Sequence, residues 1–293
     1  MLTISGLSKT YPGGVRALDS VTLDIPKGMF GLLGPNGAGK STLMRTIATL
    51  QDADSGSIRF DGIDVRSAKL ELRKRLGYLP QEFGAYPHTS PEVMLGHLAA
   101  LKGIHGAERQ NVVRDLLVRT NLWDVRKRSI DKFSGGMRQR FGVAQALIGN
   151  PSLLIVDEPT AGLDPVERRR FQNLLSEIGE DVVVILSTHI VDDVAALCTR
   201  VAIMAAGRIL RVGEPHLLTA ELDGRLWSAA VDKADIERLR ATLKIISTRI
   251  AAGRTEVRVL ADSAPAGMHA AQPTLEDVYF ATLQEHGIDT SAA

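Results

Sequence analysis

Nine consecutive residues near the N-terminus have the types and the spacing needed to bind a phosphate chain. They are Gly34-Pro35-Asn36-Gly37-Ala38-Gly39-Lys40-Ser41-Thr42. The pattern is a glycine, four residues, and then Gly-Lys-Ser/Thr. Its glycines let the backbone curl so that the N–H groups point inward. Lys40 can reach β- and γ-phosphates, and the Ser41 hydroxyl can coordinate Mg²⁺. The pattern therefore predicts a phosphate site with a magnesium ion.

The residues on either side of this loop predict the elements that position it. Residues 29–33 are largely apolar, like a short buried strand, and residues 43–48 contain no helix breaker. A helix that begins near Lys40 directs the positive end of its dipole toward the loop, where phosphate is favoured. A glycine-rich turn without a ligand is the alternative. The strand–loop–helix order favours the binding site.

Two adjacent acids follow another apolar run. Residues 153–156 are all apolar, which is typical of a strand buried on both faces of a parallel sheet. Asp157 and Glu158 come next, and acids at a buried strand end are costly unless they serve metal or proton chemistry. We predict that Asp157 acts at Mg²⁺ and that Glu158 is a general base that polarises water. The alternative is an ordinary turn that caps the next helix.

Three further positions carry useful chemistry but also fit plain structural roles. Tyr11 lies at a turn between two alternating strands, where it can stack on a flat base or pack on its own sheet. Gln81 ends a short strand and can touch a metal ion or water, although a loop glutamine is the simpler explanation. His189 follows the apolar run 182–186, at the edge where ligands bind in open α/β sheets. A lone histidine at such a place is usually structural.

A second glycine pair begins a later helix. Ser134 is a suitable N-cap for a helix running to about Ile148, and Gly135 and Gly136 leave the first N–H groups bare. A helix start of this kind can bind an anion. Taken alone, the stretch is better explained as a helix start softened by glycines. Asp164 lies in the loop that follows the two acids, before the next helix.

Composition limits the classes of function. The chain has 293 residues, a net charge of +1 and a single cysteine, Cys198. Nothing in this charge balance indicates a nucleic-acid partner, and the basic runs 126–128 and 168–170 are expected to be solvated helix faces. One cysteine allows no internal disulfide and fits a reducing compartment. We see no signal peptide and no apolar run near the ~20 residues that span a bilayer. Any membrane role would therefore need a partner.

The segments differ in pattern along the chain. Residues 1–28 alternate between apolar and polar, as half-exposed antiparallel strands do, and residues 90–150 are mainly helical. After residue 213 the pattern becomes strand, helix, strand, strand. A linker over 264–272 then leads to a last helix, which begins with a capping-box pair, Thr274 and Asp277. This last part contains no catalytic constellation.

In this order the motifs resemble those of the ATP-binding cassette (ABC) ATPases, over roughly residues 1–212. The resemblance implies that Tyr11 stacks on adenine and that residues 34–42 are the Walker A loop. It further implies that residues 153–158 are Walker B. It also assigns the Q-loop Gln81, the signature Ser134-Gly135-Gly136, the D-loop Asp164 and the switch histidine His189. The implied ligands are ATP and Mg²⁺, the latter at Ser41, Gln81 and Asp157. The implied catalytic residues are Lys40, Gln81, Glu158 and His189.

The resemblance also implies a fold and a domain organisation. We expect an α/β P-loop NTPase core of RecA-like type, with antiparallel β and helical subdomains. This nucleotide-binding domain would cover residues 1–212, with the helical subdomain at about 88–150. Residues 213–293 would form a small α+β accessory domain.

The family's partners follow from the same resemblance. A second cassette, identical or not, would close over the nucleotide. A membrane permease would be contacted through residues 82–90, which places the chain peripherally at the cytoplasmic face of the membrane. Met137 departs from the general signature, where glutamine stands. The run Met-Arg-Gln-Arg that it begins resembles drug, antibiotic and polysaccharide exporters, as do residues 188–191 and 275–280.

An exporter subunit is therefore the first expectation. An importer subunit and a soluble non-transport ABC ATPase are the alternatives. Soluble ribosome-acting members usually carry two cassettes, whereas this chain has one phosphate loop. Chromosome and repair ATPases need a long coiled coil between loop and signature, and the segment here is short and lacks heptads.

Overall fold

The largest sheet carries the predicted buried strands. The computed structural model describes residues 1–293 apart from 82–83, 85–87, 161, 180, 252 and 289–293. In it, this sheet has the order β10–β9–β3–β8–β7–β6. Its strands are β3 (Gly28–Leu33), β6 (Leu76–Leu79), β7 (Leu153–Asp157), β8 (Val183–Thr188), β9 (Arg200–Ala205) and β10 (Arg208–Gly213). All neighbours are parallel except β10, which pairs antiparallel with β9. Every residue of β7 and β8 is buried, as the apolar runs predicted.

A second, antiparallel sheet comes from the N-terminal part of the chain. Its order is β2–β1–β4–β5. The strands are β1 (Leu2–Thr10), β2 (Arg16–Ile25), β4 (Ser55–Phe60) and β5 (Ile63–Asp64). Helix α1 (Lys40–Ile47) lies between the two sheets, because Leu43 and Ile47 share one apolar cluster with Ile4, Phe60 and Phe30. This burial fixes the helix that follows the phosphate loop.

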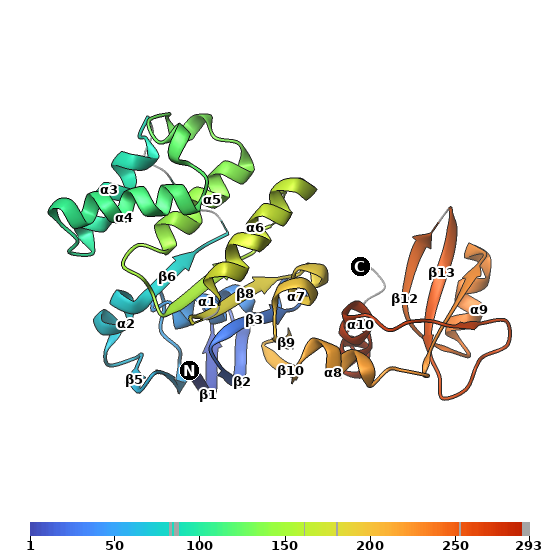
Figure 1. Cartoon of the computed structure of the whole chain (residues 1–293). Coiled ribbons are helices and arrows are strands. Elements are labelled where there is room, and N and C mark those ends of the chain that lie inside the picture. Colours follow the sequence, from blue (N-terminus) through green and yellow to red (C-terminus); the bar gives the residue numbers. More distant parts are fainter. Residues whose placement is uncertain (82–83, 85–87, 161, 180, 252, 289–293) are drawn as a thin grey trace.

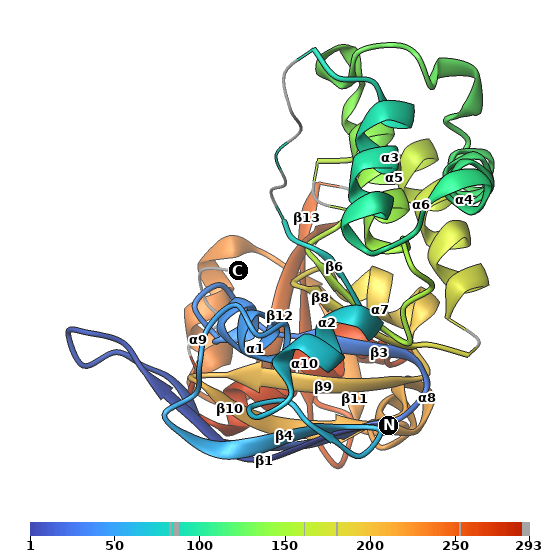
Figure 2. The ribbon, with the colours of Figure 1, turned by 90° about the vertical axis from the view of Figure 1, so that its left-hand side faces the viewer.

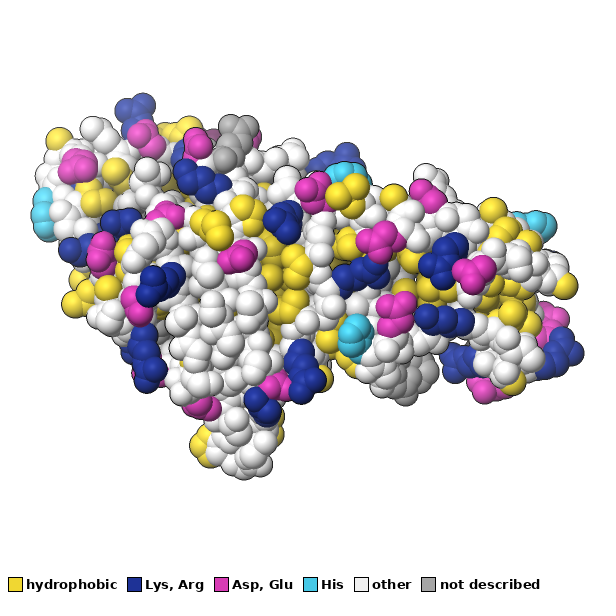
Figure 3. Space-filling view, turned by 90° about the horizontal axis from the view of Figure 1, so that it is seen from below, with side chains coloured by type: hydrophobic (Ala, Val, Ile, Leu, Met, Phe, Trp, Pro, Cys, Tyr) yellow, Lys and Arg dark blue, Asp and Glu magenta, His cyan; other side chains and the backbone are white. Residues whose placement is uncertain are grey.

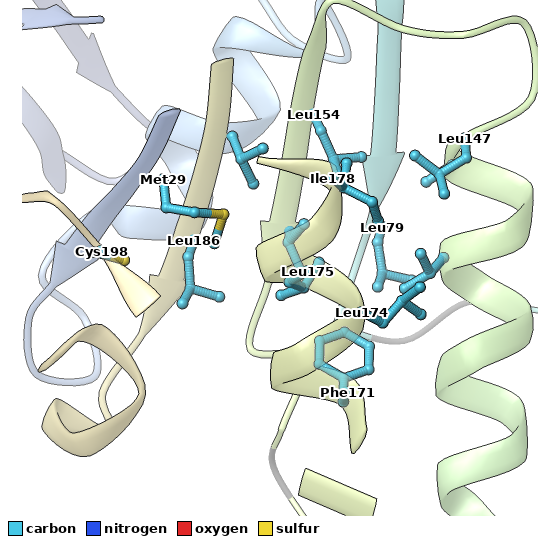
Figure 4. Packing of buried hydrophobic residues seen from close by; sticks show 14 of the residues in the cluster. Met29, Leu79, Leu147, Leu154, Phe171, Leu174, Leu175, Ile178, Leu186 and Cys198 are labelled. Atoms are coloured by element: carbon cyan, nitrogen blue, oxygen red, sulfur yellow. The ribbon is translucent and has the colours of Figure 1, made fainter. Parts of the chain in front are cut away.

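The other face of the large sheet is covered by helices. Phe171 and Leu175 of α6 (Pro165–Ile178) pack with Leu186 of β8, and α7 (Val191–Leu197) also lies on this face. Figure 4 shows the cluster, in which the labelled residues are Met29, Leu79, Leu147, Leu154, Phe171, Leu174, Leu175, Ile178, Leu186 and Cys198. Cys198 is a buried thiol, and burial raises its pKa.

A helical group stands beyond the edge of the sheets. It contains α3 (Pro91–Leu101), α4 (Gly106–Arg119) and α5 (Gly135–Ala146), with short turns at Trp123–Val125 and Ile130–Lys132. Figure 2 shows the group above the sheets, with α2 (Lys69–Arg75) below it. The predicted helical stretch over 90–150 is therefore present.

The C-terminal part forms a third sheet, of order β12–β13–β11–β14. Its strands are β11 (Leu226–Val231), β12 (Lys244–Ala251), β13 (Arg254–Leu260) and β14 (His269–Ala270), and the nearby helices are α8 (Pro215–Ala220), the turn Lys233–Asp235, α9 (Ile236–Arg240) and α10 (Leu275–Glu285). Figure 1 shows this sheet to one side of the large one. The expected linker over 264–272 contains β14, so that expectation was wrong in part. The predicted capping box of Thr274 and Asp277 is confirmed.

Helix α10 connects the third sheet to the rest of the molecule. Leu275, Val278 and Leu283 belong to the large apolar cluster, and α10 contacts α7, α8 and β10. Its residue Ala281 packs instead with Leu226 of the third sheet. The last helix is therefore held on both sides.

The surface carries charges of both signs. Figure 3 shows acidic and basic side chains interspersed over one face, with apolar side chains between them. Within the described ranges, none of the helices combines the length and the apolar character needed to cross a bilayer.

Candidate functional site

The phosphate loop lies at the carboxyl end of β3, pressed against two neighbouring segments. A Cβ atom on Gly34 would lie 2.2 Å from the Met204 carbonyl oxygen, and one on Gly39 would lie 2.3 Å from that of Ala17. Gly39 also has a φ of 104° and is the N-cap of α1. Only glycine fits such a close approach combined with a positive φ. The loop thus leads directly into the helix, as its sequence predicted.

A cavity of about 600 Å³ opens over the loop. It collects most of the predicted site residues: Tyr11, Pro35, Asn36, Gly37, Ala38, Gly39, Lys40, Ser41, Thr42, Gln81, Glu158 and His189. These residues come from distant parts of the chain. The strand ends of the large sheet bring them together, apart from Tyr11, which follows β1 of the second sheet. The position agrees with the rule that ligands bind at the carboxyl edge of open α/β sheets.

Lys40 is buried and folded back across its own loop. Its Nζ donates to the Gly34 carbonyl at 2.6 Å and to that of Pro35 at 3.2 Å. Glu158 Oε1 lies 3.7 Å from the same nitrogen. Burial lowers the pKa of Lys40, and the charges of Glu158 and Asp157 oppose that shift. The ammonium is therefore held in place at the cavity floor.

Glu158 is fixed in an unusual backbone conformation. Its φ is 48°, a left-handed value that is uncommon for a residue other than glycine. Its N–H donates to the Ser187 carbonyl at 2.8 Å, which ties the end of β7 to β8. Its Oε2 lies 2.7 Å from His189 Nδ1, while the His189 side chain remains 51% exposed. A buried carboxylate joined to a half-exposed imidazole can take and hold a proton at the cavity wall.

Asp157 is the best-placed residue for a divalent cation. It is buried at the end of β7, and its Oδ1 has no hydrogen-bond partner among the described residues. Burial raises its pKa, whereas the nearby hydroxyls of Ser187 and Ser41 oppose the shift. A buried carboxylate oxygen without a donor is costly unless a cation meets it. A carboxylate, a hydroxyl and substrate phosphates are ligands that Mg²⁺ commonly accepts, so the donor set fits this ion.

Tyr11 and Gln81 lie on the lining of the cavity. The Tyr11 hydroxyl donates to Gln51 Oε1 at 2.9 Å and lies 3.3 Å from Thr42 Oγ1. Its ring is thereby anchored beside the start of α1. Gln81 lies two residues after the last residue of β6, Leu79. Of the expected partner segment 82–90, residues 82–83 and 85–87 lie outside the described residues.

The signature residues lie elsewhere in the chain. Ser134 is the N-cap of α5, because its Oγ accepts from the Met137 N–H at 3.2 Å. The predicted cap is confirmed, and the helix ends at Ala146 rather than near Ile148. Gly136 packs so closely on α6 that a Cβ would lie 2.3 Å from Glu167 Oε2. Ser134, Gly135 and Gly136 are not among the described residues that line the cavity over the phosphate loop.

Asp164 also lies away from this cavity lining. Its Oδ1 accepts from the N–H groups of Val166 and Glu167, both at 2.9 Å, and so caps α6. Within one chain the structure thus gathers the loop, Gln81, Glu158 and His189, and leaves the signature and Asp164 as a separate surface.

Sequence reasoning missed two groups of residues. Arg16, Ala17 and Ala206 line the cavity, and they come from strand β2 and the β9–β10 turn, which no local pattern connects to the loop. The run 168–170 was expected to be a solvated helix face, but Arg168 Nε donates to buried Asp193 at 2.7 Å. That expectation was wrong for Arg168, because a charged residue facing inward cannot be told from its neighbours in a basic run.

Comparisons with known proteins point to one family. The ABC transporter family model matches residues 18–161. The chain is 38% identical over 228 residues to the probable multidrug ABC transporter ATP-binding protein YbhF of Escherichia coli, covering 77% of this chain but only 39% of the length of YbhF. It is 35% identical over 268 residues to the phosphonates import ATP-binding protein PhnC 2 of Synechococcus, covering 85% of this chain and all of PhnC 2.

A solved structure shows the same fold. It is the dimeric post-hydrolysis state of the ATP-binding cassette MJ0796 bound to ADP and Pi, with a TM-score of 0.67 and 25% identity, covering 73% of this chain and 98% of the other. The fold is thus that of the P-loop cassette ATPases, whose ligands are ATP and Mg²⁺. On the family match, the identity over a whole relative and the shared fold, this chain belongs to the ATP-binding proteins of the ABC transporter family.

Proposed function

We propose that this chain binds and hydrolyses ATP as the energy-coupling subunit of a membrane exporter. The observation that carries the ATPase part is the meeting of Lys40, Glu158 and His189 at one cavity, with buried Asp157 next to Lys40 and Ser41. Two observations support export: the run Met-Arg-Gln-Arg that begins at Met137, and the similarity to YbhF, which is described as a probable multidrug transporter protein. An importer is the second candidate, because PhnC 2 is described as a phosphonate importer.

The phosphate chain is held by the loop and its helix. The N–H groups at the end of the loop and the start of α1 would face the anion, and the Lys40 ammonium, which donates to the Gly34 and Pro35 carbonyls, would bind the phosphates. The ring of Tyr11 would stack on the adenine. Ser41, Gln81 and Asp157 would hold Mg²⁺, which when bound would supply positive charge next to the phosphate oxygens.

Glu158 is the general base. Its carboxylate faces the cavity and accepts a proton from the attacking water, while His189 holds the opposite oxygen and so fixes the direction of the carboxylate. Gln81 orients the same water from the end of β6. General bases of this type typically contribute about 10²–10⁴-fold to a rate.

A second cassette completes the site. Ser134, Gly135 and Gly136 lie off the cavity of their own chain, so a two-fold, head-to-tail pair lets each signature close over the nucleotide of the other chain. Asp164 lies at the surface, at the N-cap of α6, and would border that interface. The solved MJ0796 cassette is itself dimeric.

The membrane subunit has a candidate docking groove. A cavity of about 900 Å³ runs between α2 and α4, and Leu70 and Leu101 on its rim are 74% and 84% exposed. The charged residues that line the groove are of both signs, with Lys74 and Arg119 beside Glu108 and Asp115. We propose that a cytoplasmic helix of the permease, apolar with charged flanks, docks there as well as at the expected segment 82–90, and holds the chain at the cytoplasmic face of the membrane. Residues 1–212 would then be the nucleotide-binding domain, and residues 213–293 an accessory unit.

One variant tests the ATPase proposal. We expect Glu158→Gln to retain ATP affinity, to lose ATP turnover by at least about 100-fold, and to accumulate as a dimer with Mg·ATP. Steady-state hydrolysis, equilibrium ATP binding and size-exclusion chromatography measure the three properties. A variant that hydrolyses ATP at the wild-type rate would remove Glu158 from its role.

Two further measurements test the transporter proposal. Purification from native membranes should yield an integral membrane subunit with the chain, and a chain that always purifies alone would contradict the transporter role. In inside-out vesicles, external ATP should drive cargo into the lumen if the complex is an exporter, and out of it if the complex is an importer.

A further inference from the structure

Asp193 lies at the centre of a buried polar cluster outside the nucleotide cavity. Its side chain is completely buried in the first turn of α7. One carboxylate oxygen accepts from Arg168 Nε at 2.7 Å and from Gln172 Nε2 at 2.8 Å, and the other accepts the Thr160 hydroxyl. All three donors are side chains, and they come from α6 and from the loop that precedes it.

The cluster joins the two segments that carry the proposed base and its partner. Thr160 follows Glu158 by two residues, and Asp193 follows His189 by four, with the N-cap of α7 between them. On the opposite side, Gln139 Nε2 donates to the Pro159 carbonyl at 2.6 Å. The loop after Glu158 is thus fixed to the helix that follows His189 on one side and to the signature helix on the other.

We propose that Asp193 is a positioning residue for ATP hydrolysis, acting through Thr160. The carboxylate locks the loop after Glu158 to the helix after His189, so that the 2.7 Å contact between Glu158 and His189 keeps its geometry during turnover. The same loop contacts the signature helix through Pro159 and leads to Asp164. The bond between Asp193 and Thr160 therefore also couples the position of the signature helix to that of Glu158. This inference rests on the proposed ATP hydrolysis.

The test removes one hydroxyl without changing charge or volume. In the purified full chain, Thr160→Val should lower the kcat for ATP hydrolysis by at least about tenfold, because a small misplacement of a catalytic group is costly. The KM for ATP should stay within about twofold, since the phosphate loop is untouched. Thr160→Ser keeps the hydroxyl and should restore most of the kcat. In Asp193→Asn the Thr160 contact can persist with the amide as donor, so its kcat should fall less than that of Thr160→Val.

A matched control separates positioning from stability. Thr120 is equally buried, and its hydroxyl donates to the Leu116 carbonyl at the end of α4. Thr120→Val should lower the melting temperature but leave kcat unchanged. The inference would be overturned if Thr160→Val kept the wild-type kcat, or if Thr120→Val lost as much kcat as Thr160→Val. The role of Glu158 as general base is tested independently by Glu158→Gln. A wild-type chain that does not hydrolyse ATP would overturn the proposed function itself.

Discussion

Lys40 is bonded to its own loop. Its ammonium donates to two backbone carbonyls, and burial lowers its pKa. A phosphate oxygen would offer this ammonium a charged acceptor, and such charge-assisted hydrogen bonds are roughly twice as strong as neutral ones.

We expect Lys40→Ala to weaken ATP binding roughly 10- to 100-fold, since hydrogen bonds to charged groups contribute about 1.5–3 kcal/mol. Titration of the full chain with a fluorescent ATP analogue measures the affinity. Lys27→Ala is the control, because Lys27 is exposed and lies away from the loop. An unchanged affinity in Lys40→Ala would contradict the phosphate-loop assignment.

Asp157 makes the nucleotide-free protein sensitive to pH. Burial raises its pKa above the ordinary carboxyl value, so the folded state binds this proton more tightly than the unfolded state does. The stability that the proton contributes is fully present below the ordinary pKa and is lost as the pH rises through the raised value. At neutral pH the ionised Asp157 is therefore destabilising unless a cation meets it.

We expect Asp157→Asn to melt at least roughly 2 °C above the wild type at pH 7 without nucleotide. This advantage should shrink as the pH falls into the acid range, where Asp157 of the wild type becomes protonated. Mg·ATP should make the wild type melt above Asp157→Asn, because only the wild type keeps every residue of the proposed cation site. Thermal unfolding at several pH values measures both effects, and a lower melting point at pH 7 would contradict the argument.

The sequence predicts single residues of the candidate site where they belong to a motif. It does not predict residues that reach the site only through tertiary contacts. Lys40, Asp157 and Glu158 follow from a loop pattern and from acids after a buried strand. Arg16 and Ala206 meet the loop only through tertiary structure, and Asp193 acquires its role through donors more than 20 residues away. No local signal marks such long-range partners.

At the scale of elements, the packing of α7 on β3 depends on one glycine. A Cβ on Gly31 would lie 2.5 Å from Val194 Cγ1 and 3.2 Å from the Cys198 sulfur. The missing side chain lets the helix that follows His189 approach the strand that precedes the phosphate loop. The helix after His189 therefore packs directly on the strand that leads into the phosphate loop.

We expect Gly31→Ala to destabilise the protein by about 1–3 kcal/mol, as overpacking of a core does. Gly96→Ala is the matched control: Gly96 lies within α3, and a Cβ there would meet nothing within 4 Å. That change should be neutral or stabilise by up to about 1 kcal/mol, because alanine favours a helix. Urea unfolding of both variants measures the difference, and equal effects would contradict it.

Long elements were predictable and short ones were not. The runs 153–156 and 182–186 became β7 and β8 because a continuous apolar run has few alternatives in an α/β core. Strand β14 has only two residues, too few for any periodicity. Its existence depends on pairing with Trp227 and Ser228 of β11, which only the folded sheet reveals.

At the scale of the whole molecule, the third sheet resembles an insertion. The Ala271 N–H donates to the Leu226 carbonyl at 2.9 Å, so the chain enters and leaves the sheet at adjacent points. Helix α10 then returns to the large apolar cluster through Leu275, Val278 and Leu283. A change of pattern near residue 213 is visible in the sequence, but this return is not, because an amphipathic helix does not indicate which core it joins.

We therefore expect two C-terminal deletions to behave differently. Replacing residues 227–270 by two glycines should leave ATP binding nearly unchanged, because the ends to be joined already lie side by side. It should lower the melting temperature only moderately, through the loss of Ile246 and Arg258, which contact Ala281 and Asp277 of α10. Truncation after Gln272 should lower the melting temperature strongly, since it uncovers a face whose apolar side chains contribute about 1.5–3 kcal/mol each. Differential scanning calorimetry and ATP titration compare the two variants. If both lose stability equally, α10 belongs energetically to the third sheet; if the truncation loses much more, the nucleotide-binding unit includes the last helix of the chain.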